Sequence, residues 1–134
     1  MKQAVGLIIL LGLIISLISI VKKPEPKQFP NPRSEMAIAM REMTHQILKT
    51  KVSFQSNQVK PLNFESFKDK QFTDEKFDTD WFDPLADLLI EQAATFDQDL
   101  SVESYNLVVQ SCQSCHEHAC PGPLVQIEQL FVSE

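Results

Sequence analysis

The sequence predicts an all-α fold, an antiparallel four-helix bundle preceded by one N-terminal transmembrane helix. Its apolar residues recur at helical spacing and almost never alternate as they do in half-buried strands. Glycine, which weakens helices, occurs once between Leu13 and the C-terminus, at Gly122. An uncharged run of 18 residues, Ala4 to Val21, has the length and composition of a membrane-spanning helix.

The N-terminal run lies between Lys2 and the pair Lys22-Lys23. As a helix it measures about 27 Å, close to the thickness of the hydrocarbon core of a bilayer. It is either a retained anchor or a cleaved signal peptide, and the absence of a small-residue cleavage site after it favours the anchor. We therefore expect residues 1–23 to form a membrane anchor.

Residues 24–32 are a proline-rich linker, with four prolines in nine residues. This composition favours an extended, semi-rigid spacer over a helix, and an unstructured tether is nearly as good an interpretation. The remaining residues, 33–134, are expected to form one helical domain with a single core.

Four helices are expected in this domain. The first extends from Pro32 or from Ser34, which can act as its N-cap, to about Ser53, and the second covers about Asn63–Phe77. The third begins at Asp83-Pro84, and the fourth follows the Ser101 N-cap and is broken at Pro121-Gly122-Pro123. A short tail packs back as one or two turns. The apolar residues expected in the core of the second and third helices are Phe64, Phe67, Phe72, Leu85, Leu88, Leu89, Ala93 and Phe96.

The most informative motif is C-x-x-C-H at residues 112–116, the pattern of covalent haem attachment in c-type cytochromes. Residues i and i+3 share a helix face, so the thiols of Cys112 and Cys115 can both reach the vinyl groups of one haem. His116 is then placed to be the proximal iron ligand. A structural zinc site and a redox dithiol are the alternatives. Zinc usually needs a second ligand pair at fixed spacing, and a thioredoxin-like dithiol needs a βαβ pattern; the sequence has neither.

A stripe of methionines marks the first helix, because Met36, Met40 and Met43 follow the spacing i, i+4, i+7. The thioether is a soft ligand suited to haem iron, so Met40 or Met43 is predicted as the sixth ligand, with Met36 lining the pocket. Core packing is the alternative explanation of the stripe. His45 lies on the opposite side of the helix and His118 also points away, which disfavours a second histidine ligand.

The position of C-x-x-C-H near the C-terminus, on the last of four helices, resembles the cytochrome c prime class. The segment Ala37–Met43 is similar to the first helix of that family, and Tyr105–Leu124 is similar to membrane-anchored bacterial members of the group. The resemblance covers roughly residues 33–131. It implies one covalent haem c and four cofactor-binding residues: Cys112 and Cys115 as thioether sites, His116 as the proximal ligand, and Arg41 near a haem propionate.

The chain departs from that class in two respects. Its domain is shorter, and its methionine stripe suits six-coordinate electron-transfer proteins better than five-coordinate gas-binding ones. We therefore expect a mono-haem, single-electron carrier with no catalytic residues, tethered to the outer face of the cytoplasmic membrane with its domain in the periplasm. The alternatives are a five-coordinate haem protein that binds NO or CO, and a haem-free, membrane-tethered interaction domain.

The charge distribution indicates what the domain binds. The net charge is −6, and the stretch from Asp74 to Glu103 holds ten acidic residues and one lysine. This excess disfavours nucleic acid as a partner and favours a redox partner that is basic at the contact. Cys120 is the third cysteine; it either is a buried apolar residue at a helix end, the favoured interpretation, or links two chains in a homodimer.

Overall fold

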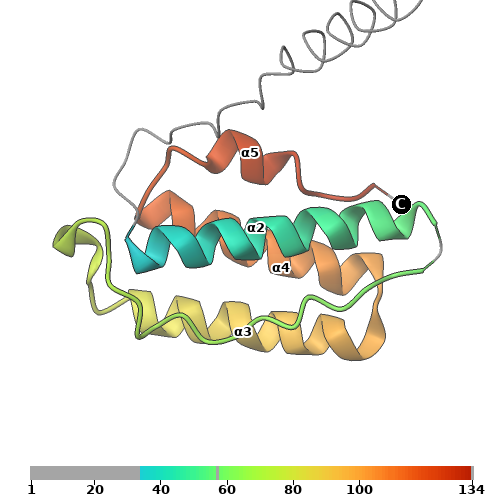
Figure 1. The fold of residues 1–134 in the computed structure, drawn as a ribbon, viewed down its shortest axis with the longest axis horizontal. Coiled ribbons are helices and arrows are strands. Elements are labelled where there is room, and N and C mark those ends of the chain that lie inside the picture. The colour runs from blue at the N-terminus through green and yellow to red at the C-terminus, as the bar shows by residue number, and fades with distance from the viewer. Residues whose placement is uncertain (1–33, 57, 134) are drawn as a thin grey trace, which may run out of the picture. The chain divides into compact units, whose positions relative to one another are not determined.

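The computed structural model describes residues 34–56 and 58–133, and in these residues it contains helices and no strand. The predicted all-α class is therefore confirmed for this part of the chain (Figure 1). The predicted anchor and linker lie outside the described residues. No helix within the described ranges is both long and apolar enough to cross a membrane. The elements follow in the order α2 (Glu35–Phe54), the 3-10 turn η1 (Glu75–Phe77), α3 (Phe82–Asp99), α4 (Val102–His118) and α5 (Leu124–Glu128).

The three long helices do not simply alternate in direction. α2 and α3 run the same way, and α4 returns antiparallel to both (Figure 1). Aromatic contacts join the ends that this topology brings together: the ring of Phe54 lies 6.3 Å from that of Phe96 and 5.3 Å from that of Tyr105. The fourth helix, α5, has only five residues. The predicted antiparallel bundle with short connections is therefore replaced by an α3–α4 hairpin to which α2 and α5 are added.

The predicted helix over Asn63–Phe77 is wrong. Residues 58–74, called the strap below, instead run in an extended path from the end of α2 back to the start of α3 (Figure 1). Asn63 has a φ of 50°, a left-handed conformation that interrupts a helix. The backbone N–H groups of Leu62 and Asn63 donate to the two carboxylate oxygens of Asp97 at 2.6 and 2.8 Å. A contact 34 residues away along the chain therefore provides the hydrogen bonds that a helix would have made internally.

The strap still contributes the core residues expected of it. Phe67 is buried together with Leu62, and Phe64 and Phe72 are half-buried against the same core. The rings of Phe67 and Phe72 make edge contacts with Phe82 at the start of α3, with centroids 5.9 and 4.7 Å apart. The aromatic spacing thus identified side chains that pack, although the backbone that carries them is not helical.

The helix ends follow local signals in the sequence. The hydroxyls of Ser34 and Ser101 accept hydrogen bonds from the N–H groups of Ala37 and Ser104, as predicted for N-caps. α3 begins at Phe82 with Trp81 as its cap, slightly before the predicted Asp83-Pro84 start. On its inner face Leu89, Ala93 and Phe96 are buried and Leu85 is half-buried. Leu88 is 41% exposed, so its predicted place in the core is wrong.

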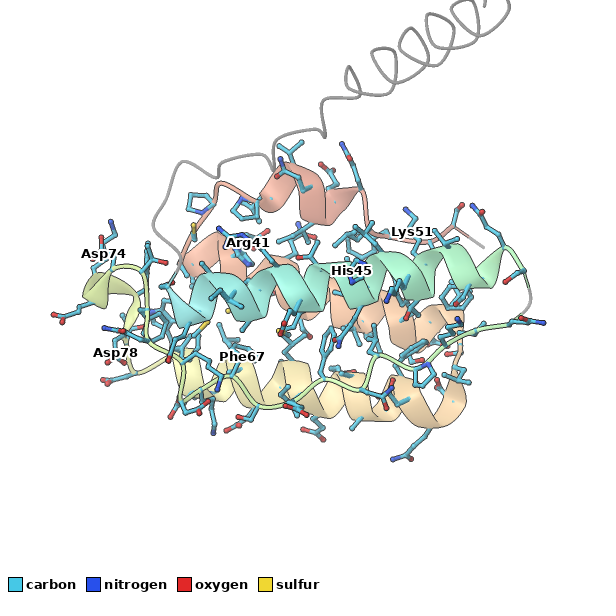
Figure 2. All side chains as sticks on the ribbon, in the orientation of Figure 1. Arg41, His45, Lys51, Phe67, Asp74 and Asp78 are labelled. Carbon is cyan, nitrogen blue, oxygen red and sulfur yellow. The ribbon has the colours of Figure 1, made fainter. Side chains whose placement is uncertain are left out.

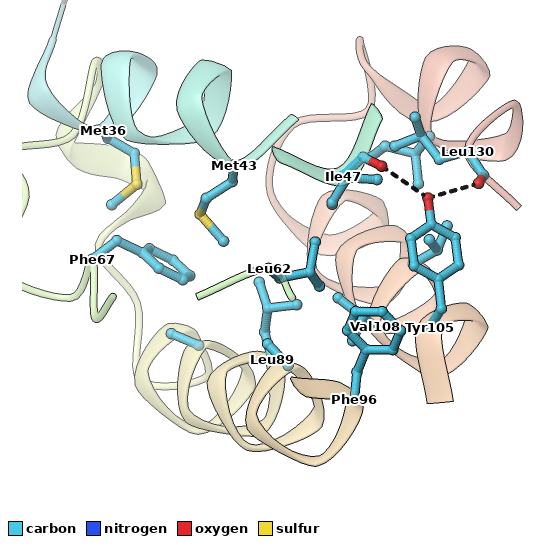
Figure 3. Packing of buried hydrophobic residues seen from close by; sticks show 14 of the residues in the cluster. Met36, Met43, Ile47, Leu62, Phe67, Leu89, Phe96, Tyr105, Val108 and Leu130 are labelled. Carbon is cyan, nitrogen blue, oxygen red and sulfur yellow. Dashed lines mark hydrogen bonds between the residues drawn. The ribbon is translucent and has the colours of Figure 1, made fainter. Parts of the chain in front are cut away.

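Tyr105 lies at the centre of the core. Its side chain is fully buried near the start of α4, and its hydroxyl lies 3.3 Å from the carbonyl oxygen of Ile47 and 3.1 Å from that of Leu130 (Figure 3). Burial raises the pKa of this hydroxyl, so it stays protonated and can donate to either oxygen. One side chain therefore connects α4 to α2 and to the C-terminal segment.

We expect Asp97→Ala to lower the free energy of unfolding by about 2 kcal/mol, because two N–H groups of the strap lose a charged acceptor. The neighbouring Gln98→Ala, at an exposed position of the same helix, is the control and should change it by less than about 0.5 kcal/mol. Urea unfolding followed by circular dichroism measures both. Equal effects of the two substitutions would show that Asp97 does not hold the strap.

Candidate functional site

The C-x-x-C-H motif occupies the last two turns of α4. The buried side of this helix carries Tyr105, Val108 and Val109, and Cys112 continues it. Cys115 follows on the next turn, so the two sulfurs share one side of the helix, as their spacing predicts. The side of α4 that faces the core therefore also carries the two thiols.

The rest of the domain covers α4 less completely at this motif than at the start of the helix. The fully buried positions end at Val109, and all six residues 111–116 are half-buried. The backbone of α4 approaches α3 and α5 closely, whereas α2 is set further from both long helices. An apolar, planar group placed against this side of α4 would cover surface that the described residues leave partly open.

The imidazole of His116 is oriented by the backbone. Its Nδ1 lies 3.0 Å from the carbonyl oxygen of Cys120. A carbonyl oxygen can only accept, so Nδ1 carries the proton and Nε2 keeps the lone pair that a metal ion requires. This orienting contact was not predicted from the sequence. Its signal was Pro121, because a proline cannot continue the helix and the chain turns there.

His118 is held apart from His116. Its Nδ1 lies 2.8 Å from the carbonyl oxygen of Ser114, and its ring centroid lies 5.8 Å from that of Trp81 at the start of α3. The two histidines of this turn thus have different neighbours.

The thiols of the motif are held in their protonated form. Burial, together with the neighbouring Cys115, raises the pKa of Cys112 to about 12, and burial raises the pKa of Cys115 as well. The motif also lies at the C-terminal end of α4, where the helix dipole disfavours a thiolate. Redox dithiols have lowered pKa values and sit at helix N-termini, so this environment disfavours the dithiol interpretation.

Cys120 is exposed, beyond the end of α4. Its favoured interpretation as a buried apolar residue is wrong, because the turn before Pro121 carries its side chain away from the core. The homodimer through Cys120 stays a prediction.

The methionines of α2 divide between two rows on the helix. Met36 and Met43 are buried beside Phe67 (Figure 3) and lie in a row with Thr50, whose hydroxyl donates to the carbonyl of Lys60 at the strap. Met40 is half-buried.

The row of Met40 faces a different neighbour. It continues through Ile47 to Lys51, whose ammonium donates to the carbonyl of Gln129 after α5. Met43 therefore lies on the side of α2 that meets the strap, and Met40 on the side that meets the C-terminal segment. Arg41, the next residue, is half-buried, and His45 is exposed (Figure 2).

Two hollows in the described surface lie away from the C-x-x-C-H motif. One, of about 540 Å³, is lined by the strap, η1 and the start of α3; the other, of about 600 Å³, is lined by α2 and by Ser56, Gln58 and Lys60. Neither is lined by the C-x-x-C-H motif, so a haem would lie against the half-buried side of α4. Within the described ranges, no three His, Cys, Asp or Glu side chains converge to hold a metal ion.

No family model, curated protein or solved structure matches this chain. The resemblance to the cytochrome c prime class stays a prediction, and the site is interpreted from its own residues.

The three thiols should differ in reactivity in chain made without haem attachment. At pH 8 iodoacetamide should label exposed Cys120 first and Cys112 last, because Cys112 is half-buried and its pKa of about 12 keeps it protonated. Because its pKa is raised in the folded state, ionisation of Cys112 favours unfolding, so stability should fall as the pH rises above about 8.5. Peptide mass spectrometry measures the labelling; equal rates at Cys112 and Cys120 would contradict the burial.

Proposed function

We propose that this chain is a mono-haem c-type cytochrome, a single-electron carrier tethered to the outer face of the cytoplasmic membrane with its domain in the periplasm. One observation carries the proposal. The C-x-x-C-H motif lies where the buried side of α4 becomes half-covered, with His116 held in the tautomer that binds iron.

Cys112 and Cys115 attach the haem. Each thiol adds across a vinyl double bond: sulfur bonds to one vinyl carbon and the hydrogen is transferred to the other, so the addition needs no oxidant. Both thiols lie on one side of one rigid helix, which fixes the plane of the group against α4. The same attachment covers the half-buried side of residues 111–116.

His116 binds iron through Nε2. Its hydrogen bond to the Cys120 carbonyl fixes the ring and makes the nitrogen a stronger donor. When bound, the haem supplies the one-electron exchange between ferrous and ferric iron. The protein then holds the group in place and limits its access to water, and no residue acts as a catalytic acid or base.

Of the two predicted sixth ligands, Met40 suits the geometry better than Met43. Met43 is 8% exposed and packs in the core on the strap side of α2, so binding iron would require it to leave a filled site. Met40 is half-buried, in the row of α2 that continues to Lys51 and meets the C-terminal segment. Arg41, beside it, is then placed to neutralise a haem propionate.

The packing of Met36 and Met43 also favours a second candidate function. Since both are core residues, most of the stripe is explained without iron. If Met40 does not bind either, the distal side is open and the domain is a five-coordinate haem protein for NO or CO.

Haem attachment is tested by mass. The full chain, made with haem maturation machinery and analysed by denaturing mass spectrometry, should retain one haem. The double variant Cys112→Ala/Cys115→Ala should lose it, and the control Cys120→Ala should keep it. A wild-type chain of unmodified mass would eliminate the cytochrome and leave the haem-free interaction domain.

The sixth ligand is tested by spectroscopy of the oxidised protein. We expect a weak near-infrared sulfur-to-iron band that Met40→Ala abolishes while opening the iron to CO. Met43→Ala should keep the band but lower the free energy of unfolding by about 2–5 kcal/mol, because it leaves a cavity in the core. A wild-type protein that is high-spin, lacks the band and binds CO at once would favour the gas-binding function.

A further inference from the structure

The outer side of α2 is unusually apolar for an exposed surface. Ile38, Leu48 and Val52 are 44%, 46% and 62% exposed. Elsewhere in the described residues, large exposed hydrophobic side chains occur singly, at Leu88 on α3, Leu107 on α4 and Val125 on α5. We call the set Ile38, His45, Leu48, Lys49 and Val52 the outer α2 face. A cluster of this kind marks a contact surface more often than scattered residues do.

The same face carries positive charge. Lys49 and Lys60 line a hollow of about 600 Å³ together with Leu48 and Val52. Among the described side chains, neither lysine has an ion-pair partner within reach. Glu42 is the one acidic residue of α2 beyond its first turn, so Lys49 and Lys60 outnumber it. The hollow therefore combines cationic groups with apolar walls, the chemistry that an anionic amphiphile requires.

The charge on α3 has the opposite sign. Its exposed residues include Asp83, Asp87 and Glu91, and Asp74 and Asp78 extend the acidic surface around η1 (Figure 2). A negatively charged plane attracts the outer α2 face and repels this acidic surface. The domain thus has a preferred orientation on such a plane.

The linker keeps the domain near one such plane. Ten residues separate Lys23 from Ser34, and fully extended they span at most about 35 Å. If residues 4–21 are an anchor, the domain stays within this distance of the lipid headgroups at all times, which favours even a weak surface contact.

We propose that the outer α2 face rests on the surface of an anionic phospholipid bilayer. Lys49 and Lys60 bind lipid phosphates, and Ile38, Leu48 and Val52 enter the boundary between headgroups and acyl chains. α2, about 30 Å long, then lies along the membrane and the acidic surface of α3 faces the solution, where a basic redox partner can approach. This inference rests on the membrane anchoring in the proposed function and not on haem binding.

The test uses the full chain in nanodiscs with a photo-crosslinking amino acid, p-benzoylphenylalanine. It replaces Val52 on the outer α2 face or, as a matched control, the exposed Leu88 on α3. In discs that contain phosphatidylglycerol, illumination should attach lipid at position 52 several times more often than at position 88. Discs of phosphatidylcholine alone, or about 0.5 M NaCl, should remove the difference, because the attraction is electrostatic.

Charge variants provide the second arm. Lys49→Glu should lower lipid attachment at position 52 about fivefold, and Lys76→Glu, the same charge change on η1, should not. Equal attachment at positions 52 and 88, no dependence on phosphatidylglycerol, crosslinking to a second copy of the chain, or loss of the chain from the discs would each overturn the proposal. Peptide mass spectrometry, which measures the attached lipid, also reports the mass of the C-x-x-C-H peptide. A failure of haem attachment is therefore distinguished from a failure of membrane contact.

Discussion

The burial of Tyr105 determines where the functional motif lies. Its hydroxyl reaches the carbonyls of Ile47 and Leu130, and its ring packs against Phe54 and Phe96. These contacts fix the rotation of α4 about its axis and its position along that axis, because a helix is rigid over its 17 residues. Cys112 lies seven residues on, two turns along the same side, and so inherits the inward orientation of Tyr105. The thiols are positioned by a contact at the other end of their helix.

The end of the helix on which the motif lies determines its chemistry. At an N-terminus the same cysteines would be stabilised as thiolates and would exchange disulfides. At the C-terminus of α4, and partly buried, they stay protonated. Just beyond the same helix end, the carbonyl of Cys120 lies 3.0 Å from Nδ1 of His116 and orients its ring. One feature of the backbone would therefore favour both the thioether formation and the imidazole ligation that we propose.

Signals that act over a few residues predicted this structure well, and contacts between distant residues could not be predicted. The caps at Ser34 and Ser101 are local and are found as predicted, and the C-x-x-C-H motif lies on a helix, α4. The strap depends on Asp97, a residue far along the chain, and no pattern within 58–74 identifies that acceptor. The methionine stripe is an intermediate case. Its period correctly gives one side of α2, but only the partners of Thr50 and Lys51 show that Met43 and Met40 face different neighbours.

α2 lies further from α3 and α4 than these two helices lie from each other, and this separation relates the candidate site to the outer surface of α2. Because α3 and α4 pack closely and α2 does not, a planar group bound to α4 would have α2 as its other wall. The inner side of α2 would then contact the haem through Met40, while its outer side carries Lys49 and the exposed aliphatic residues. A helix with both surfaces in use is constrained in sequence on nearly every turn. These two proposed contacts would account for the buried stripe and the apolar outer face of α2, whereas the outer side of α3 is predominantly acidic.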